Sequence, residues 1–593
     1  MIGKMTRYAF ILLRGEEEGF LEKLQDLGLV DITRSVKPVD ERSAAMLARA
    51  EKYRTLLASL DKVEIPEGTA STPAQGDDEK AAAAILERLS ANADDRKAAE
   101  RELAAVRPWG EFSPETLAKL SDAGAAVHFH ILIEKSFRPE WSEESAVEVI
   151  ARESGKVWFV VAGEDNLPGE VPAPKVSASE VEARLEKIDS DRKAMLAEAA
   201  GIKDRASELE AACSAQLGDL DRYLAGLSAE TAAQDRIVTM VGYAPVEDEK
   251  SVKECLDALG VFYVADPAEV EDNPPIKLKN NRFVRMFEVL TDMYGRPAYD
   301  GFDPTPFIAV FFLLFFAFCM GDCGYGLVLI AIGLLLKKVD SFKDLSPLVV
   351  TLGIGTTVIG FLFHTFFSMD IAKWSMFAPI KGIFLPEKIA GYDGTMVLAL
   401  VVGVVHICLA MVVKTIHETR TKGFLNSLGT WGWTLLIVGG VIVGAFALAG
   451  VLDKELTKWI VIVLGVISAL GIFLLNDLHR NPLLNIGSGL WETYNTVTGL
   501  LGDVLSYLRL YALGLAGAML GKAFNDIGAM ILGDGSSVVM WIPFVLVVLI
   551  GHTLNVAMAA LGAFVHPLRL NFLEFFKNSG YEGNGRNFNP LKK

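Results

Sequence analysis

The sequence predicts a chain of two halves: an N-terminal cytoplasmic α/β domain, and an α-helical membrane domain with about eight spans, of which the last two are long and tilted. Three observations predict this division. The chain has 593 residues, which is too long for one domain. Charged residues are dense up to about residue 300, and apolar runs dominate beyond it. The mean hydropathy of +0.32 is high for a soluble protein.

Composition excludes several classes of protein. The formal net charge is −17, and phosphate binding requires a concentrated basic face, so we expect no nucleic-acid partner. The N-terminus has no basic segment followed by an apolar one, so it does not read as a secretory signal and the soluble half is expected in the cytoplasm. The five cysteines are scattered without metal-ligand spacing or a disulfide framework. We therefore expect neither a metal nor a cofactor.

The cytoplasmic domain, residues 1–300, is predicted to contain two α/β lobes. In the first lobe, about 1–40 with 235–300, the stretch "MTRYAFILLRGEEEGFLEKLQDLGLVDITR" reads as strand, amphipathic helix and strand. "RIVTMVGYAPV" and "VFYVAD" would return two strands to it. In the second lobe, 107–176, "AVHFHILI" and "KVWFVVAG" read as strands, with "EESAVEVIARES" as a helix between them.

Two long helical stretches, about 41–106 and 177–234, bracket the second lobe. Both are rich in Ala, Leu, Glu, Lys and Arg at helical spacing, which is typical of long surface helices or a coiled coil. Because the second lobe lies between them, the two stretches are predicted to run antiparallel as a coiled coil that joins the lobes. This half of the chain therefore reads as a strut.

The membrane domain, residues 301–593, is predicted from eight apolar runs. A bilayer core of about 30 Å requires roughly 20 residues of helix. An even number of spans returns the C-terminus to the side of the N-terminal domain, and the excess of basic residues in the loops of that side favours a cytoplasmic location for both. The weakest boundary is the break at "GDCG", 321–324. The runs lie at about 304–321, 323–338, 346–367, 395–415, 429–452, 457–475, 486–532 and 538–577.

The last two runs are too long to cross the bilayer upright. A helix of about 45 residues measures about 70 Å, so each run is expected to tilt, to break or to project beyond the membrane. Arg509 lies in the first of them, and a charged side chain at the bilayer centre costs about 2.5–3.5 kcal/mol on insertion scales. Asp503 lies six positions earlier, about 120° around the helix, and so does not share its face.

The final run repeats this pattern. A stripe at 3, 4, 3, 4, 3 spacing ends in Arg569, and the nearest acid, Glu574, lies about 140° away from that arginine. Neither arginine thus has an obvious partner within its own helix, and the sequence predicts a partner on another helix or another chain. The residues of the stripe are His552, Asn555, Ala559, Gly562, His566 and Arg569.

A carboxyl group that moves past such an arginine would change its protonation. In lipid the neutral form is favoured, because desolvation penalises the charge, whereas a fixed guanidinium stabilises the ionised form. An acid carried past Arg509 would therefore release its ion there and could reload after leaving.

Three segments carry a family resemblance: "DPTPFIAVFFLLFFAFCMGDCGYGL", "GDVLSYLRLYALGLA" and "LGAFVHPLRLNFLEFFKNSGYEGNGRNFNP". They resemble the membrane-embedded stator subunit of rotary V-type and archaeal A-type ATPases, which is called subunit a or, in bacteria and archaea, subunit I. The resemblance extends over the whole order of parts, including the two-lobed cytoplasmic half. It implies a prokaryotic plasma-membrane protein.

The resemblance also implies roles for residues and partners. Arg509 matches the family's essential arginine in "SYLRL", which faces a ring of proteolipid subunits whose carboxylates carry the ion. Arg569, with His566 before it, matches a second arginine motif. Two aqueous half-channels would meet the ring on either side of Arg509. Glu492 and Asp503 are expected nearer the inner half-channel, and His552, Asn555 and His566 nearer the outer one. The half-channel candidates are Glu492, Asp503, Ser506, Tyr507, His552 and Asn555.

The implied partners are the proteolipid ring, peripheral-stalk subunits, the lipid bilayer and, indirectly, the central-stalk and nucleotide-binding subunits. The chain is expected to be no enzyme on its own, since it contains no G-x-x-x-x-G-K-[ST] motif. It departs from eukaryotic vacuolar relatives at Gly517 and Ala559, where they carry histidine and glutamate. Pro567 is also unusual, since it removes a backbone donor from the last helix.

Other interpretations stay open at this point. A secondary transporter with a cytoplasmic regulatory domain would require repeated halves, and we find no such repeat. A membrane-anchored scaffold would leave Arg509 unexplained. Arg509 could instead pair with an acid of an earlier span, and Arg569 could anchor the helix at the interface. Four polar residues near predicted helix ends fit caps or interfaces at least as well as transport: Asp322, His364, His406 and Glu418.

Overall fold

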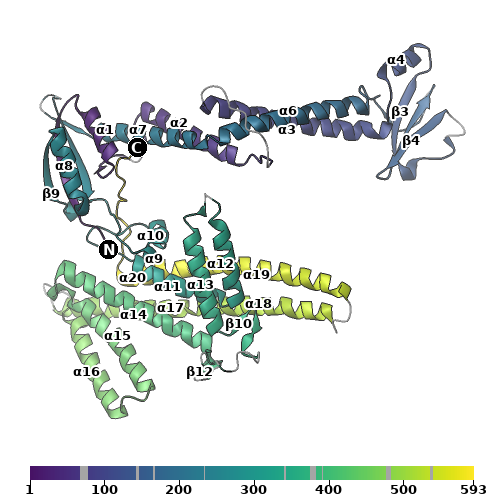
Figure 1. Cartoon of the computed structure of the whole chain (residues 1–593). Coiled ribbons are helices and arrows are strands. Elements are labelled where there is room, and N and C mark those ends of the chain that lie inside the picture. Colours follow the sequence, from purple (N-terminus) through teal and green to yellow (C-terminus); the bar gives the residue numbers. More distant parts are fainter. Residues whose placement is uncertain are drawn as a thin grey trace. The chain divides into compact units, whose positions relative to one another are not determined.

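The computed structural model (Figure 1) divides into two compact units. Unit 1 comprises Met1–Phe10, Leu29–Asp31 and Val241–Pro590, and unit 2 comprises Ile11–Gly28, Ile32–Met240 and Leu591–Lys593. The predicted domain boundary at residue 300 stays a prediction. The structure describes the whole chain except residues 36, 67–77, 142–145, 164–166, 233, 235, 340–341, 374–378, 380–381, 383, 390, 476–481, 534–537 and 593.

A sheet with strand order β2-β8-β1-β9 forms the first lobe, with β7 paired to β8. Along β1 the side chains alternate, so that Tyr8 and Phe10 are buried whereas Ile11 is exposed. The predicted strand-helix-strand and the return of two later strands are confirmed. The elements are β1 (Met5–Leu13), α1 (Glu17–Leu27), β2 (Asp31–Ile32), β7 (Glu230–Ala232), β8 (Ile237–Pro245), α8 (Glu249–Leu259) and β9 (Phe262–Pro267).

The second lobe is a sheet of order β4-β5-β3-β6, flanked by α4 (Pro114–Asp122). The predicted helix at 143–154 is wrong, since the described part of this stretch forms strand β4; residues 142–145 lie outside the described residues. Val147 and Val149 alternate with polar residues, and the two-residue turn at Ser154 and Gly155 has positive φ at both, which closes a hairpin. The strands are β3 (Val127–Ile133), β4 (Val147–Glu153), β5 (Lys156–Ala162) and β6 (Glu170–Val171).

Four helices occupy the stretches predicted as a coiled coil. α3 packs on α6 and α2 on α7. Arg88 pairs with Glu198 at 2.8 Å and Arg96 with Asp189 at 2.9 Å, so α3 and α6 run antiparallel. The coiled-coil packing itself stays a prediction, and residues 67–77 of the stretch lie outside the described part. The helices are α2 (Glu41–Asp61), α3 (Asp78–Val106), α6 (Ala178–Lys203) and α7 (Ala206–Leu227).

Apolar helices make up most of unit 1. Within the described part of the chain, five helical segments are long and apolar enough to cross a membrane: Gly394–Lys422, Leu425–Leu448, Lys454–Phe473, Asn485–Leu532 and Trp541–Ser579. They contain α14 (Gly394–Lys422), α15 (Leu428–Leu448), α16 (Lys454–Phe473), α17 (Pro482–Ser506), α18 (Leu508–Leu532), α19 (Trp541–Arg569), a π-helical segment (Leu570–Phe575) and α20 (Phe576–Ser579).

The predicted count of eight spans is not confirmed. The first three apolar runs form shorter helices of 16, 14 and 17 residues, α11 (Thr305–Met320), α12 (Cys323–Leu336) and α13 (Ser346–Leu362). At 1.5 Å per residue each is about 21–26 Å long, which is less than the bilayer core of about 30 Å. The break predicted at 321–324 is present between α11 and α12. Shorter elements are α9 (Arg282–Arg285), α10 (Glu288–Tyr294), β10 (Thr365–Phe366), β11 (Met369–Asp370), β12 (Lys388–Ile389) and β13 (Tyr392–Asp393).

Candidate functional site

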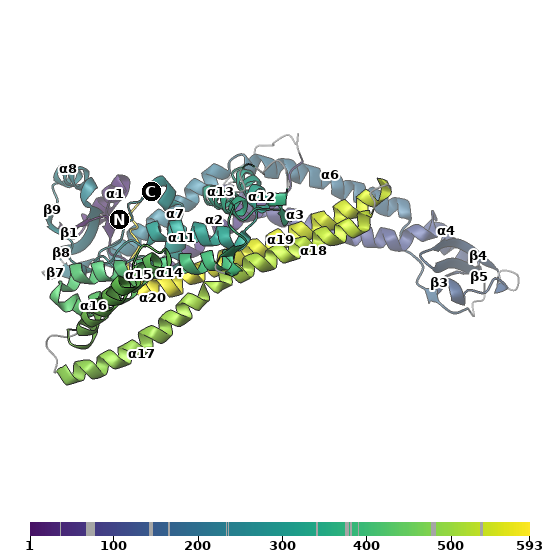
Figure 2. The same cartoon turned by 90° about the horizontal axis from the view of Figure 1, so that it is seen from below.

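Both arginine-bearing helices are interrupted beside the arginine. The first long apolar helix breaks at Tyr507, between α17 and α18 and two residues before Arg509 (Figure 2). In the second, α19 gives way after Arg569 to the π-helical segment Leu570–Phe575. Pro567 lacks the backbone donor that a regular helix requires there. The Pro567 carbonyl itself accepts a hydrogen bond from Asn571 Nδ2 at 2.9 Å. Single π turns inside α-helices are frequent at functional sites.

The Arg509 guanidinium is only weakly satisfied. Its Nη2 lies 3.4 Å from Ser506 Oγ, a long contact. Its Nη1 is buried and has no hydrogen-bond partner among the residues that the structure describes, none of which forms a salt bridge with Arg509. Asp503 accepts hydrogen bonds from Lys577 and Asn578 instead, as expected from its position on another face. A buried cationic nitrogen without a hydrogen-bond partner is costly, because its desolvation is not compensated.

Three helices converge around Arg509. It lies on α18, which packs against both α11 and α19, and α11 also packs against α19. α18 and α19 lie side by side (Figure 1). Arg569 is exposed. The three residues that the sequence singled out for ion translocation thus lie on two helices that pack against each other, Arg509 on α18, and His566 and Arg569 on α19.

A first cavity, of about 270 Å³, contains both acids predicted for the inner half-channel. Glu492 and Asp503 line it from α17, with Lys414 from α14 and Lys577 from α20. Lys577 Nζ lies 3.3 Å from both Asp503 oxygens, and Asn578 Nδ2 donates to Asp503 Oδ2 at 2.8 Å. The cavity therefore holds carboxylates and cations in one polar space.

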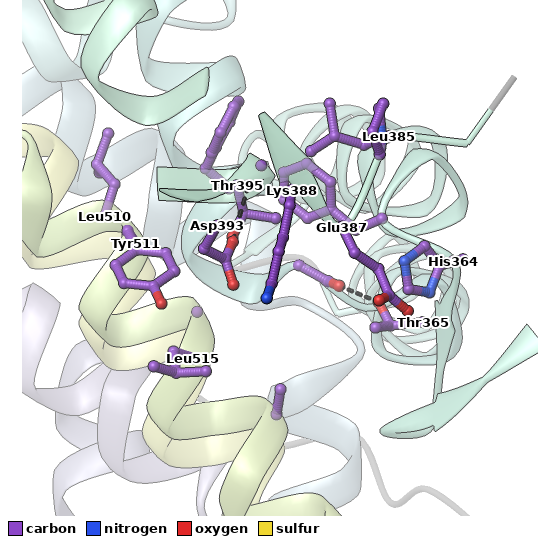
Figure 3. Close-up of a pocket in the computed structure, with 17 residues that line it drawn as sticks. His364, Thr365, Leu385, Glu387, Lys388, Asp393, Thr395, Leu510, Tyr511 and Leu515 are labelled. Carbon is purple, nitrogen blue, oxygen red and sulfur yellow. Dashed lines mark hydrogen bonds between the residues drawn. The ribbon is translucent and has the colours of Figure 1, made fainter. Parts of the chain in front are cut away.

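A second cavity, of about 410 Å³, borders the start of α18. Figure 3 shows Tyr511 and Leu515 of α18 on one side, facing Glu387, Lys388 and Asp393 on the other. The sequence placed Lys388 in a loop on the outer side but did not predict that these three charged residues line a cavity, because they lie between apolar runs and show no helical pattern. The loop that carries these residues lies far from α18 in the sequence and meets it only in the tertiary fold.

The two cavities lie on either side of Arg509. Along α17 and α18, the first cavity ends at Asp503 and the second begins at Leu510. Along α14, the second cavity includes Thr395 and the first includes Lys414. These two residues are 19 positions apart on one helix, or about 28 Å, close to the thickness of a bilayer core.

His552 and Asn555, predicted near the outer half-channel, belong to a buried hydrogen-bonded network and line neither cavity. Tyr325 Oη lies 2.7 Å from His552 Nδ1 and accepts from Asn555 Nδ2 at 2.8 Å. The same Asn555 amide donates to the Gly517 carbonyl at 2.8 Å, and His552 Nε2 lies 2.9 Å from Asn525 Oδ1. Tyr325 and Asn525 were missed, although a polar side chain inside an apolar helix was a signal for each.

All four residues left open as caps or interface groups have partners. His364 Nδ1 lies 3.0 Å from Asp370 Oδ1, and Glu418 accepts from Lys422 Nζ at 3.1 Å. Asp322 is the N-cap of α12: its Oδ1 accepts from the amides of Gly324 at 2.8 Å and Tyr325 at 3.2 Å. Its carboxylate also accepts from the amides of Phe367 at 2.9 Å and Ser368 at 2.6 Å. Asp322 is therefore a cap. His406 is fully buried and lies 2.9 Å from the Tyr507 hydroxyl.

The chain matches the model of the V-type ATPase 116 kDa subunit family over residues 222–346 and 491–593, which include both arginines. It is 25% identical to "V-type ATP synthase subunit I" of Chlamydia trachomatis over 98% of each chain. It is 26% identical to "V-type ATP synthase subunit I 1" of Treponema pallidum over the full length of both.

An archaeal relative, "A-type ATP synthase subunit I" of Methanocaldococcus jannaschii, is 27% identical over 71% of this chain and 64% of its own length. The crystal structure of the N-terminal domain of a subunit I matches 44% of this chain at 16% identity, with a TM-score of 0.16 that is too low to show a shared arrangement. The sequence matches confirm the resemblance: the chain is similar to subunit I of A-type and V-type ATP synthases, which are components of rotary ATPases.

Proposed function

We propose that this chain is the ion-translocating stator subunit of its rotary ATPase, forming two half-channels against a proteolipid ring and coupling the flow of H⁺ or Na⁺ to ring rotation. One observation carries the proposal: two cavities flank a buried guanidinium nitrogen that has no partner among the described residues. An ion entering one cavity would reach the ring on one side of Arg509 and leave from the other side through the second cavity.

Arg509 would act by charge alone. A guanidinium stays protonated in proteins, so it offers no site at which a proton could pass directly between the cavities. Facing the ring, it would stabilise each ring carboxylate in its ionised form, whereas lipid favours the neutral form. A carboxylate could then leave the arginine only by taking up an ion from the opposite half-channel. The Arg509 guanidinium would thus both prevent a leak of ions between the half-channels and couple ring rotation to ion transport.

The remaining parts of the proposal concern placement and partners. The cavity with Glu492 and Asp503 would open to the cytoplasm, on the side of the N-terminal domain, and the cavity of Figure 3 to the opposite side. The three short apolar helices would enter the bilayer with the five long ones, which returns the count to eight. The N-terminal domain would hold peripheral stalks against the torque of the ring, and ATP would be made or hydrolysed by other subunits.

The opposite openings of the two cavities are testable by cysteine labelling in the assembled complex. In a background whose five native cysteines are replaced, Asn495→Cys probes the first cavity and Thr395→Cys the second. A membrane-impermeant maleimide is expected to label Asn495→Cys only from the cytoplasmic side and Thr395→Cys only from the other side. Ile442→Cys, on an exposed apolar face of α15, is the control and should react from neither side. Labelling of both cavity positions from one side would contradict the proposal.

Membership of the rotary complex is tested by purification. A tagged chain is expected to copurify with nucleotide-binding subunits and a small proteolipid, whereas a transporter or a scaffold would not retain both.

A further inference from the structure

A buried histidine links the two helix interruptions that carry the arginines. His406 of α14 is 0% exposed, and its ring is sandwiched between two phenylalanines. Phe311 of α11 stacks on it with ring centroids 4.2 Å apart, and Phe575 stacks on it at 4.8 Å with an interplanar angle of 10°. Phe575 is the last residue of the π-helical segment that follows Arg569. The histidine therefore contacts one interruption directly through a ring stack.

The same histidine holds the other interruption through a hydrogen bond. Tyr507, at the break between α17 and α18, is 0% exposed, and its hydroxyl lies 2.9 Å from His406 Nδ1. The tyrosine ring rests against α14 where Gly403 leaves room for it: a Cβ at Gly403 would lie 2.3 Å from Tyr507 Cγ. The break two residues before Arg509 is thus fixed in position by close packing as well as by the hydrogen bond.

We propose that His406 is a positioning residue that sets both arginines in place, through Tyr507 for Arg509 and through Phe575 for Arg569. Its ring is not suited to carry ions, because it lines neither cavity and its Nε2 has no hydrogen-bond partner among the described residues. Stacking on both faces and one directional hydrogen bond prevent the His406 ring from rotating. The ring in turn fixes the positions of the Phe575 and Tyr507 side chains that contact it. The consequence for ion transport rests on the function proposed above.

The geometric part can be tested without measuring transport. Spin labels at Leu505 and Met519, both exposed, span the break by 14 positions, or about 21 Å of helix. Electron–electron double resonance in the purified complex is expected to show a broader or shifted distance distribution for Tyr507→Phe, His406→Phe and Gly403→Ala. The first two variants remove the hydrogen bond while retaining an aromatic ring, and the third displaces the tyrosine. An unchanged distribution in all three would overturn the proposal.

Matched controls separate positioning from a general loss of stability. Tyr494→Phe changes an exposed tyrosine of the same helix, and Gly440→Ala adds a methyl group where nothing lies within 4 Å. In both control variants the distance distribution should be the same as in the parent protein. The double variant His406→Phe with Tyr507→Phe should change the distribution no more than either single one, because both remove one shared interaction. An additive effect would show that the hydrogen bond is not the cause.

The functional part is read as ions transported per ATP hydrolysed in reconstituted vesicles, a ratio that a smaller amount of folded complex would not alter. Tyr507→Phe and His406→Phe are each expected to lower it about fivefold, the factor that corresponds to one lost hydrogen bond. An altered distance distribution with an unchanged ratio would refute the functional part of the proposal. An unchanged distribution would overturn the positioning role while the proposed function stands or falls on Arg509.

Discussion

Replacement of Arg509 by alanine is expected to abolish ATP-driven ion transport by the assembled complex, with a loss of about 100-fold or more, as for removal of a charge that stabilises an ionic intermediate. Without the guanidinium, no positive charge would stabilise the ionised form of a ring carboxylate between the half-channels. The carboxylate would therefore pass that point with its ion still bound. Transport and ATP hydrolysis should be measured in the same vesicles, with dyes for H⁺ and for Na⁺.

Two further variants sharpen this prediction. Lys522→Ala removes an exposed cation of the same helix and should leave transport near the parent's level. Arg509→Lys keeps a positive charge but replaces it with an amine that can deprotonate, so we expect little transport together with a passive leak of protons. Normal pumping by Arg509→Ala would refute the role that we give to this residue.

Replacement of Asp322 by alanine is expected to give the largest loss of stability. The buried carboxylate accepts from four backbone amides, and each buried donor left without an acceptor costs about 1–3 kcal/mol. Phe367 and Ser368, which donate two of these bonds, have φ of 46° and 59°, a strained conformation for residues with side chains. Asp322→Ala removes both of these hydrogen bonds from the strained turn, and the apparent melting temperature of the purified chain in detergent should fall strongly.

Two comparisons distinguish this cap from a transport role. Asp322→Asn retains one carbonyl oxygen and should give an intermediate loss. Asp393 is an exposed N-cap of α14 and accepts from the Thr395 amide at 2.9 Å. Asp393→Ala should therefore lower the apparent melting temperature only slightly. If Asp322→Ala melted like the parent and yet blocked transport, Asp322 would belong to the ion path instead.

Elements with a strong local pattern were predictable from the sequence. The alternation in "RYAFILL" marked β1, and the apolar runs beyond residue 300 marked the long helices. The strand β4 was mistaken for a helix because its polar and charged residues suit both periods, whereas its pairing with β5 decides the outcome. The lengths of α11, α12 and α13 depend on where each helix ends, which an apolar run does not specify.

The site was predictable where a residue's chemistry conflicts with its surroundings. An arginine within an apolar segment identified Arg509, and helical spacing excluded Asp503 as its partner. The positions of the interruptions were less predictable. Pro567 signalled the second one, but "SYLRL" contains neither proline nor glycine, and the break at Tyr507 depends on packing against Gly403 and His406, about 100 residues earlier. The charged loop of Figure 3 likewise meets α18 only through the tertiary fold.

The most direct test of the central claim is an experimental map of the intact complex that resolves the side chain of Arg509. The account predicts that the guanidinium faces the proteolipid ring and comes within about 4 Å of an ionised ring carboxylate as the ring turns. A map in which the guanidinium points away from the ring and is bound to a carboxylate of its own chain would contradict it.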